Sequence, residues 1–181
     1  METKKELRYS HDFSYDRILY ENFIPVLCIM HRKDCIDHVG MFDPILKGTE
    51  DWDLWIRMSR VFKFAHINKT TCEFRWVEDG ETMSSKHDKH RSIWIFAQLN
   101  IIYKHLSEIE AKPRISKMIQ SRVEYFLKEI RDNLFSKLSS NDLVDINKDF
   151  GFPDLDSVID RFLFLLEQYG PHYKTQFNEV L

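Results

Sequence analysis

Apolar and polar residues change their spacing along the chain near residue 90. Beyond that point, apolar residues recur every three or four positions over three stretches, at 91–106, at 113–138 and from Pro153 onward. This spacing places the apolar side chains on one face of a helix. Because three such helices can bury their apolar faces against one another, residues 89–181 are predicted to form a helical bundle.

The first part of the chain, residues 1–88, carries shorter patterns of two kinds. Helical patterns cover 16–20, 32–38 and 50–60. Short apolar or alternating runs, which are typical of strands, cover 24–30, 62–67 and 71–76. The chain is therefore predicted to be α+β and mostly helical, with a partial α/β segment followed by the helical region.

The helix predicted to begin at residue 50 has the strongest local signals. Thr49 is a suitable N-cap residue. Glu50, Asp51 and Asp53 crowd the first turn, where the helix dipole favours negative charge. Asp53 and Arg57 are four residues apart and are predicted to form an ion pair. By its spacing alone, this acidic turn indicates no more than a stable helix start.

Composition narrows the classes of function and location. The net charge of −3 gives no reason to expect nucleic acid or an anionic membrane as a partner. No apolar run is long enough to span a bilayer and no signal-peptide core follows Met1, so we expect a cytoplasmic protein, free or peripheral to a membrane. Cys28, Cys35 and Cys72 lack metal-ligand spacing and are predicted to be free thiols in a reducing compartment.

Four short motifs follow one another in the first part. They are Asn22-Phe23-Ile24-Pro25, His31-Arg32, Val39-Gly40-Met41-Phe42-Asp43 and Glu50-Asp51-Trp52-Asp53-Leu54-Trp55-Ile56-Arg57. Over residues 15–76, their order and spacing resemble the acceptor-side half of family 2 glycosyltransferases with a GT-A fold. Met41 stands where the family's turn usually has a second glycine.

The resemblance implies a catalytic role for the acidic turn. In such enzymes, a carboxylate at this helix start is the general base, which takes the proton from the acceptor hydroxyl as its oxygen attacks the anomeric carbon. By its position in the motif, the resemblance assigns this role to Asp51. Glu50 is the alternative base or a hydrogen-bonding partner of the acceptor, and Asp53 is assigned to structure. The helix N-terminus is expected to keep the base ionised.

The resemblance also assigns substrate contacts, each beside a structural alternative. Trp52, and with it Trp55, is assigned to stacking on a sugar ring, with packing in the core as the alternative. Arg75 and Trp76 lie where the family has a strand leading into an acceptor loop. Arg75 is assigned to the donor diphosphate, with a structural salt bridge as the alternative.

The family also has a nucleotide-binding half with an Asp-x-Asp motif, and no segment of this sequence matches it. The complete enzyme is expected to use a divalent metal, Mg or Mn, a nucleotide-sugar donor and a glycan or other hydroxyl acceptor. His66, His87 and His90 have no carboxylate cluster around them, so no metal ligand is predicted in this chain. The chain is expected to be a C-terminal fragment that is inactive by itself.

A non-catalytic interaction module is the alternative prediction. In that case, the helical region beyond residue 90 binds a partner protein, and the four motifs are a relic of the transferase fold. Exposed apolar stripes on the helical region would favour this alternative.

Self-association is the first testable prediction. The predicted strands would belong to a sheet whose other strands lie elsewhere, and open strand edges pair readily with another chain. We therefore expect light scattering at high protein concentration to give a mass above that of the 21.9 kDa chain. A monomer at every concentration would contradict the prediction.

Overall fold

The computed structural model describes residues 6–46, 48–73 and 91–133, together with residues 160, 163–165, 167–169 and 171. Within these residues the regular structure is helical, and no strand is found. The prediction of a mostly helical protein is confirmed. In the same part of the chain, no helix is both long and apolar enough to cross a membrane.

The described residues of the first part form three α-helices and one 3-10 turn. They are α1 (Tyr15–Tyr20), η1 (Val26–Cys28), α2 (Lys33–Val39) and α3 (Glu50–Ser59). The Ser14 hydroxyl caps α1 by accepting a hydrogen bond from the backbone N–H of Arg17. Gly40 ends α2 with φ of 83°, a conformation that glycine adopts without steric cost, and its N–H donates to the carbonyl of Ile36.

The strands predicted at 24–30 and 62–67 are not found. Residues 24–30 contain the turn η1 flanked by extended residues, and 62–67 have no regular structure. A strand needs a hydrogen-bonded neighbour, and no described segment pairs with either run. The apolar side chains of Val26, Leu27 and Met30 are consequently exposed. Of the run predicted at 71–76, residues 71–73 are irregular and the rest lies outside the described residues.

The described residues of the second part are mostly helical, as predicted. It contains α5 (Arg91–Lys104), α6 (Leu106–Glu110) and α7 (Pro113–Asn133). Pro113 begins α7, where its missing N–H removes no helical hydrogen bond. Of the helix predicted from Pro153, residues 160, 163–165 and 167–169 are described and are helical.

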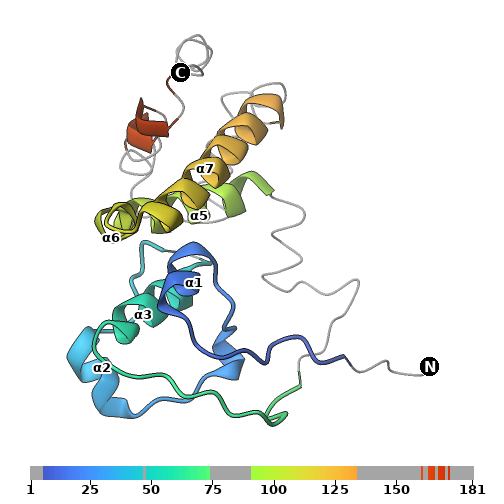
Figure 1. The fold of residues 1–181 in the computed structure, drawn as a ribbon, viewed down its shortest axis with the longest axis vertical. Coiled ribbons are helices and arrows are strands. Elements are labelled where there is room, and N and C mark those ends of the chain that lie inside the picture. Colours follow the sequence, from blue (N-terminus) through green and yellow to red (C-terminus); the bar gives the residue numbers. More distant parts are fainter. Residues whose placement is uncertain are drawn as a thin grey trace.

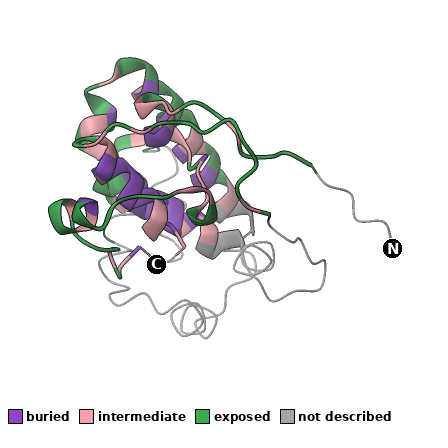
Figure 2. Cartoon of the chain, turned by 90° about the horizontal axis from the view of Figure 1, so that it is seen from below, coloured by how far each residue is buried: buried purple, intermediate pink, exposed green. Residues whose placement is uncertain are grey.

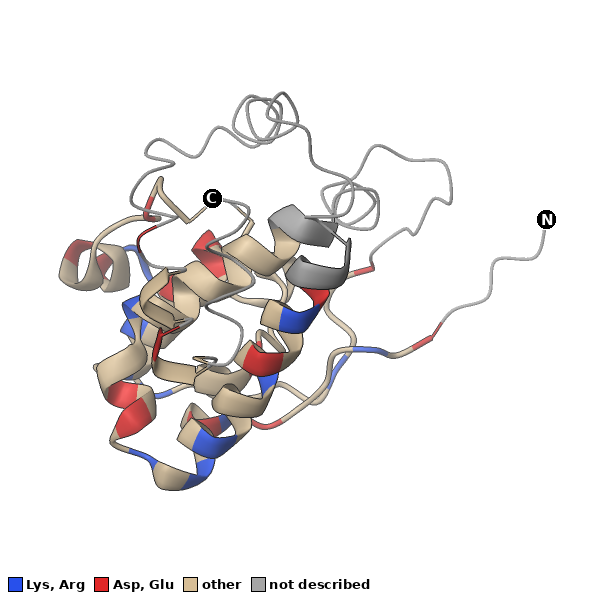
Figure 3. Ribbon diagram, turned by 90° about the horizontal axis from the view of Figure 1, so that it is seen from above, with Lys and Arg blue, Asp and Glu red and all other residues tan. Residues whose placement is uncertain are grey.

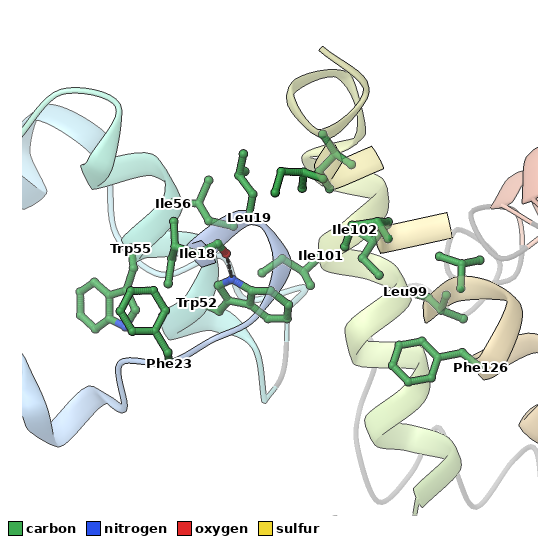
Figure 4. Close-up of a cluster of buried hydrophobic side chains, with 14 of the residues drawn as sticks. Ile18, Leu19, Phe23, Trp52, Trp55, Ile56, Leu99, Ile101, Ile102 and Phe126 are labelled. Carbon is green, nitrogen blue, oxygen red and sulfur yellow. Dashed lines mark hydrogen bonds between the residues drawn. The ribbon is translucent and has the colours of Figure 1, made fainter. Parts of the chain in front are cut away.

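One hydrophobic core joins the two parts. The helices α5, α6 and α7 lie together on one side, and α1, α2 and α3 lie on the other (Figure 1). Buried residues line the faces where the helices meet, whereas the outer faces are exposed (Figure 2). The cluster at this junction includes the fully buried Ile18, Leu19, Trp52, Ile101 and Ile102 (Figure 4). Acidic and basic residues are interspersed along the described helices (Figure 3).

Arg122 of α7 connects the same two parts through polar contacts. Its guanidinium donates hydrogen bonds to the carbonyl of Tyr20 and, at 2.9 Å, to the side-chain oxygen of Gln98. It also lies over the rings of Tyr20, Trp52 and Phe126. Only a planar, multi-donor group can make both hydrogen bonds while stacking on aromatic faces.

Replacing Arg122 by lysine tests this connection. The ammonium group cannot reproduce both hydrogen bonds and the stacking, so we expect Arg122→Lys to lower the free energy of unfolding by about 1–3 kcal/mol. Arg114 lies on the same helix but is exposed, so Arg114→Lys is the matched control and should change stability little. Urea unfolding measures both, and equal stability of the two variants would contradict the prediction.

Candidate functional site

The first turn of α3 places three acids in three different environments. Glu50 and Asp51 are half-buried, and Asp53 is fully buried. Thr49 occupies the N-cap position predicted for it, but its hydroxyl makes no capping hydrogen bond. The Asp51 side chain, and not the N-cap hydroxyl, therefore satisfies a free N–H group of this helix start, that of Trp52.

Asn22 holds the Asp51 carboxylate. The Nδ2 atom of Asn22 donates to Oδ1 of Asp51 at 3.1 Å, and the backbone N–H of Trp52 donates to the same oxygen at 2.7 Å. The carbonyl oxygen of the Asn22 side chain accepts from the backbone N–H of Ile24 at 3.3 Å, which orients the amide. Because Asn22 is exposed, this side of the carboxylate faces solvent.

Burial raises the pKa of Asp51 above its ordinary value. The hydrogen bonds from Trp52 and Asn22 oppose this rise in pKa, and the negative charge of Glu50 adds to it. Desolvation is the largest of these effects on the pKa of Asp51, and whether the helix N-terminus keeps the carboxylate ionised stays a prediction. A carboxylate with a raised pKa is a stronger base than an ordinary aspartate.

Two oxygen atoms beside Asp51 are buried without a hydrogen-bond partner among the described residues. They are Oε2 of Glu50 and Oγ1 of Thr49, and Thr49 is 2% exposed. A buried polar atom without a partner destabilises a fold by about 1–3 kcal/mol.

Asp53 is bound by three cationic or donor groups and is 0% exposed. Its Oδ2 accepts from Nε of Arg57 at 2.8 Å, which confirms the predicted ion pair. Its Oδ1 lies 2.9 Å from both Nζ of Lys104 and Nε2 of His105. Although burial opposes it, these partners lower the pKa of Asp53 far below its ordinary value. Asp53 is thus structural, as the motif implies.

Arg57 carries this network to the turn that follows α2. Besides Asp53, its guanidinium binds the carbonyl oxygens of Val39 and Gly40, and that of Met41 at 2.7 Å. The structure therefore brings the glycine turn and the acidic helix, which are separate motifs in the sequence, into direct contact.

The two tryptophans of α3 belong to the core. The indole N–H of Trp52 donates to the carbonyl of Ile18, and that of Trp55 donates to the carbonyl of Ile24 at 3.0 Å. Trp52 is 1% exposed, so its ring has no free face for a sugar in this structure (Figure 4). Packing, the alternative to stacking, accounts for its position.

Other predicted residues lie away from this turn or outside the described part. Arg75, Trp76, His87 and His90 fall in the range 74–90, which is not described. His66 lies 3.1 Å from a carboxylate oxygen of Asp12 and 3.0 Å from the hydroxyl of Ser10.

The described residues do not fit a metal site. No group of three histidine, cysteine, aspartate or glutamate side chains in the described ranges could hold an ion. Asp51 and Asp53 have the spacing of an Asp-x-Asp motif, but both oxygens of Asp53 already have protein partners.

No protein-family model matches the chain, and comparisons with curated proteins and with solved structures find no match either.

Opposite effects of Asp51 and Asp53 on stability follow from their pKa shifts. Asp51 binds its proton more tightly in the folded state than in the unfolded state. Its ionisation therefore lowers the free energy of unfolding as the pH rises above about 3.9, the pKa of an aspartate in the unfolded chain. Asp53 stabilises the fold above that pH, and this stabilisation is lost as pH falls through its lower folded pKa.

We therefore expect Asp51→Asn to raise the free energy of unfolding at pH 7. Asp53→Asn should lower it by about 3–5 kcal/mol, because the cations around it lose their counter-charge. Urea unfolding at pH 7 and pH 4 checks both variants, and the gain from Asp51→Asn should shrink at pH 4. A loss of stability in both variants at pH 7 would overturn the assignment of the two environments.

Proposed function

We propose that this chain forms the acceptor side of an inverting glycosyltransferase in which Asp51 is the general base. The observation that carries the proposal is the Asp51 carboxylate at the start of α3, held by Asn22 and with a raised pKa. Both residues belong to the motifs by which the sequence resembles the family 2 glycosyltransferases.

In the proposed reaction, an acceptor hydroxyl donates a hydrogen bond to Asp51. The carboxylate takes the proton as the hydroxyl oxygen attacks the anomeric carbon of a nucleotide-sugar, and the nucleoside diphosphate leaves. A base on the first turn of a helix is held rigidly, as this proton transfer requires. The half-buried Glu50 accepts a hydrogen bond from a second hydroxyl of the acceptor.

A purely structural role accounts poorly for Asp51. An acid that only complements the helix dipole would be more stable ionised, and its pKa would fall. Burial instead disfavours the ionised form of Asp51, so the position is unfavourable for stability. Residues kept at a cost to stability are typical of functional sites.

The proposal includes a sheet completed by the nucleotide-binding half of the enzyme. Val26, Leu27 and Met30 expose apolar side chains that such a sheet would cover, and Ile29 already has an extended backbone. In that arrangement, residues 24–30 and 62–67 would be strands of the completed sheet. Arg75 and Trp76 remain assigned to substrate contacts by the resemblance.

The test is made in the complete enzyme, with the nucleotide-binding half present. Release of the nucleoside diphosphate is followed over a panel of nucleotide-sugars and acceptors. We expect Asp51→Asn to lower kcat by about 10²–10⁴-fold, the contribution of a general base, and to leave nucleotide-sugar binding unchanged. Nucleotide binding is measured separately by calorimetry.

Asp34→Asn is the matched control. Asp34 is also an acid in the first turn of a helix, α2, but it is exposed, and among the described residues it pairs only with the exposed Arg32. This variant should transfer sugar at the normal rate. Normal turnover by Asp51→Asn would refute the proposal and favour the non-catalytic interaction module.

A further inference from the structure

Cys28 and Cys72 lie side by side although 44 residues separate them in the sequence. Their Sγ atoms are 3.6 Å apart. Cys28 is the last residue of η1, and Cys72 lies in the irregular segment 71–73. Both side chains are half-buried, so a small molecule in solution can reach them.

The third cysteine has a different environment. Cys35 lies in α2 and is 7% exposed, within the hydrophobic core. A buried thiol of this kind is inert toward dissolved oxidants. The fold thus separates one protected thiol from an accessible pair, and the spacing of the cysteines in the sequence gives no sign of this division.

We propose that Cys28 and Cys72 form a dithiol site that converts reversibly to a disulfide by exchange with a small-molecule disulfide of the glutathione type. The thiolate of one cysteine attacks a sulfur of oxidised glutathione, which forms a mixed disulfide and releases one glutathione. The thiolate of the other cysteine then attacks the protein sulfur of that mixed disulfide and releases the second glutathione. In total, two protein thiols are oxidised and one glutathione disulfide is reduced to two thiols.

The local structure permits the bond. Disulfide formation shortens the sulfur–sulfur distance to about 2.05 Å, so the two sulfur atoms must approach each other by about 1.5 Å. Neither segment belongs to a long helix: η1 has three residues and 71–73 are irregular. Rotation of the two side chains and a small shift of these segments close the distance.

The disulfide would fasten the segment that reaches α3. Six residues before Cys28, Asn22 holds the Asp51 carboxylate, and the carbonyl of Ile24 accepts from the indole of Trp55. A bond at Cys28 therefore anchors the other end of the same short segment. Residues 22–28 would then be fixed both to α3 and to the segment at Cys72.

The protonation of Cys28 sets the speed of the exchange. Burial and the neighbouring Cys72 thiol raise the pKa of Cys28 to about 11. Because the thiolate is the nucleophile, the exchange should be slow at pH 7 and faster at pH 9.

The experiment treats the folded chain with oxidised glutathione at pH 7 and pH 9. The intact mass is measured first. Unreacted thiols are then alkylated in denaturant, and the proteolytic peptides are measured by mass spectrometry. We expect a product lighter by two hydrogen atoms, a linked peptide that contains Cys28 and Cys72, and alkylation of Cys35 alone. Dithiothreitol should reverse the change. The oxidised chain should also unfold at a higher temperature than the reduced chain, because the cross-link restricts the unfolded state.

Single substitutions are the controls. Cys35→Ser should still form the disulfide, whereas Cys28→Ser and Cys72→Ser should stop at the glutathione adduct. The unsubstituted chain gives the result independently of whether any variant folds. The proposal is overturned if the unsubstituted chain yields only glutathione adducts, pairs through Cys35, or forms only disulfides between two chains.

Discussion

The buried carboxylate of Asp53 is the interaction on which the arrangement of the two parts depends. It accepts from Arg57 of its own helix and from Lys104 and His105 at the end of α5. A buried charge is tolerated only if every lone pair finds a partner. Because Lys104 and His105 come from the second part of the chain, Asp53 can be buried only when α3 and α5 lie against each other.

The partners of Asp53 extend this constraint in two directions. Arg57 binds the carbonyls of the turn at Gly40, and Lys104 also binds Asp43 just beyond it at 2.6 Å. On the other side, Nδ1 of His105 lies 2.8 Å from the guanidinium of Arg60, and Nε2 of the same ring lies 2.9 Å from Asp53. The start of α3 is thus held in place from both parts of the chain.

Local patterns in the sequence predict only the part of this network that lies within one helix. The pair Asp53–Arg57 follows from a spacing of four residues. The approximate bounds of the longer helices follow from apolar residues that recur every three or four positions. The contacts of Lys104 and His105 with Asp53 span about fifty residues, and no spacing rule reports them. At 24–30, by contrast, the sequence predicts a strand that the structure does not contain. The composition of this run is that of a strand, but a strand also needs a neighbouring strand, which composition does not provide.

The pKa of Asp51 could not be predicted for the same reason, since the helix dipole is visible in the sequence and burial is not. Asp51 and Asp53 are identical side chains two positions apart on one helix, and about 200° of rotation separates them. One therefore points to the cations that join the two parts, and the other points toward Asn22 and solvent. The favourable contacts of Asp53 hold the helix start in a fixed position, and this rigidity keeps Asp51 in a site where burial opposes its charge. A carboxylate with a raised pKa, fixed on a helix and reachable from solvent, has the properties that proton abstraction from a hydroxyl group requires.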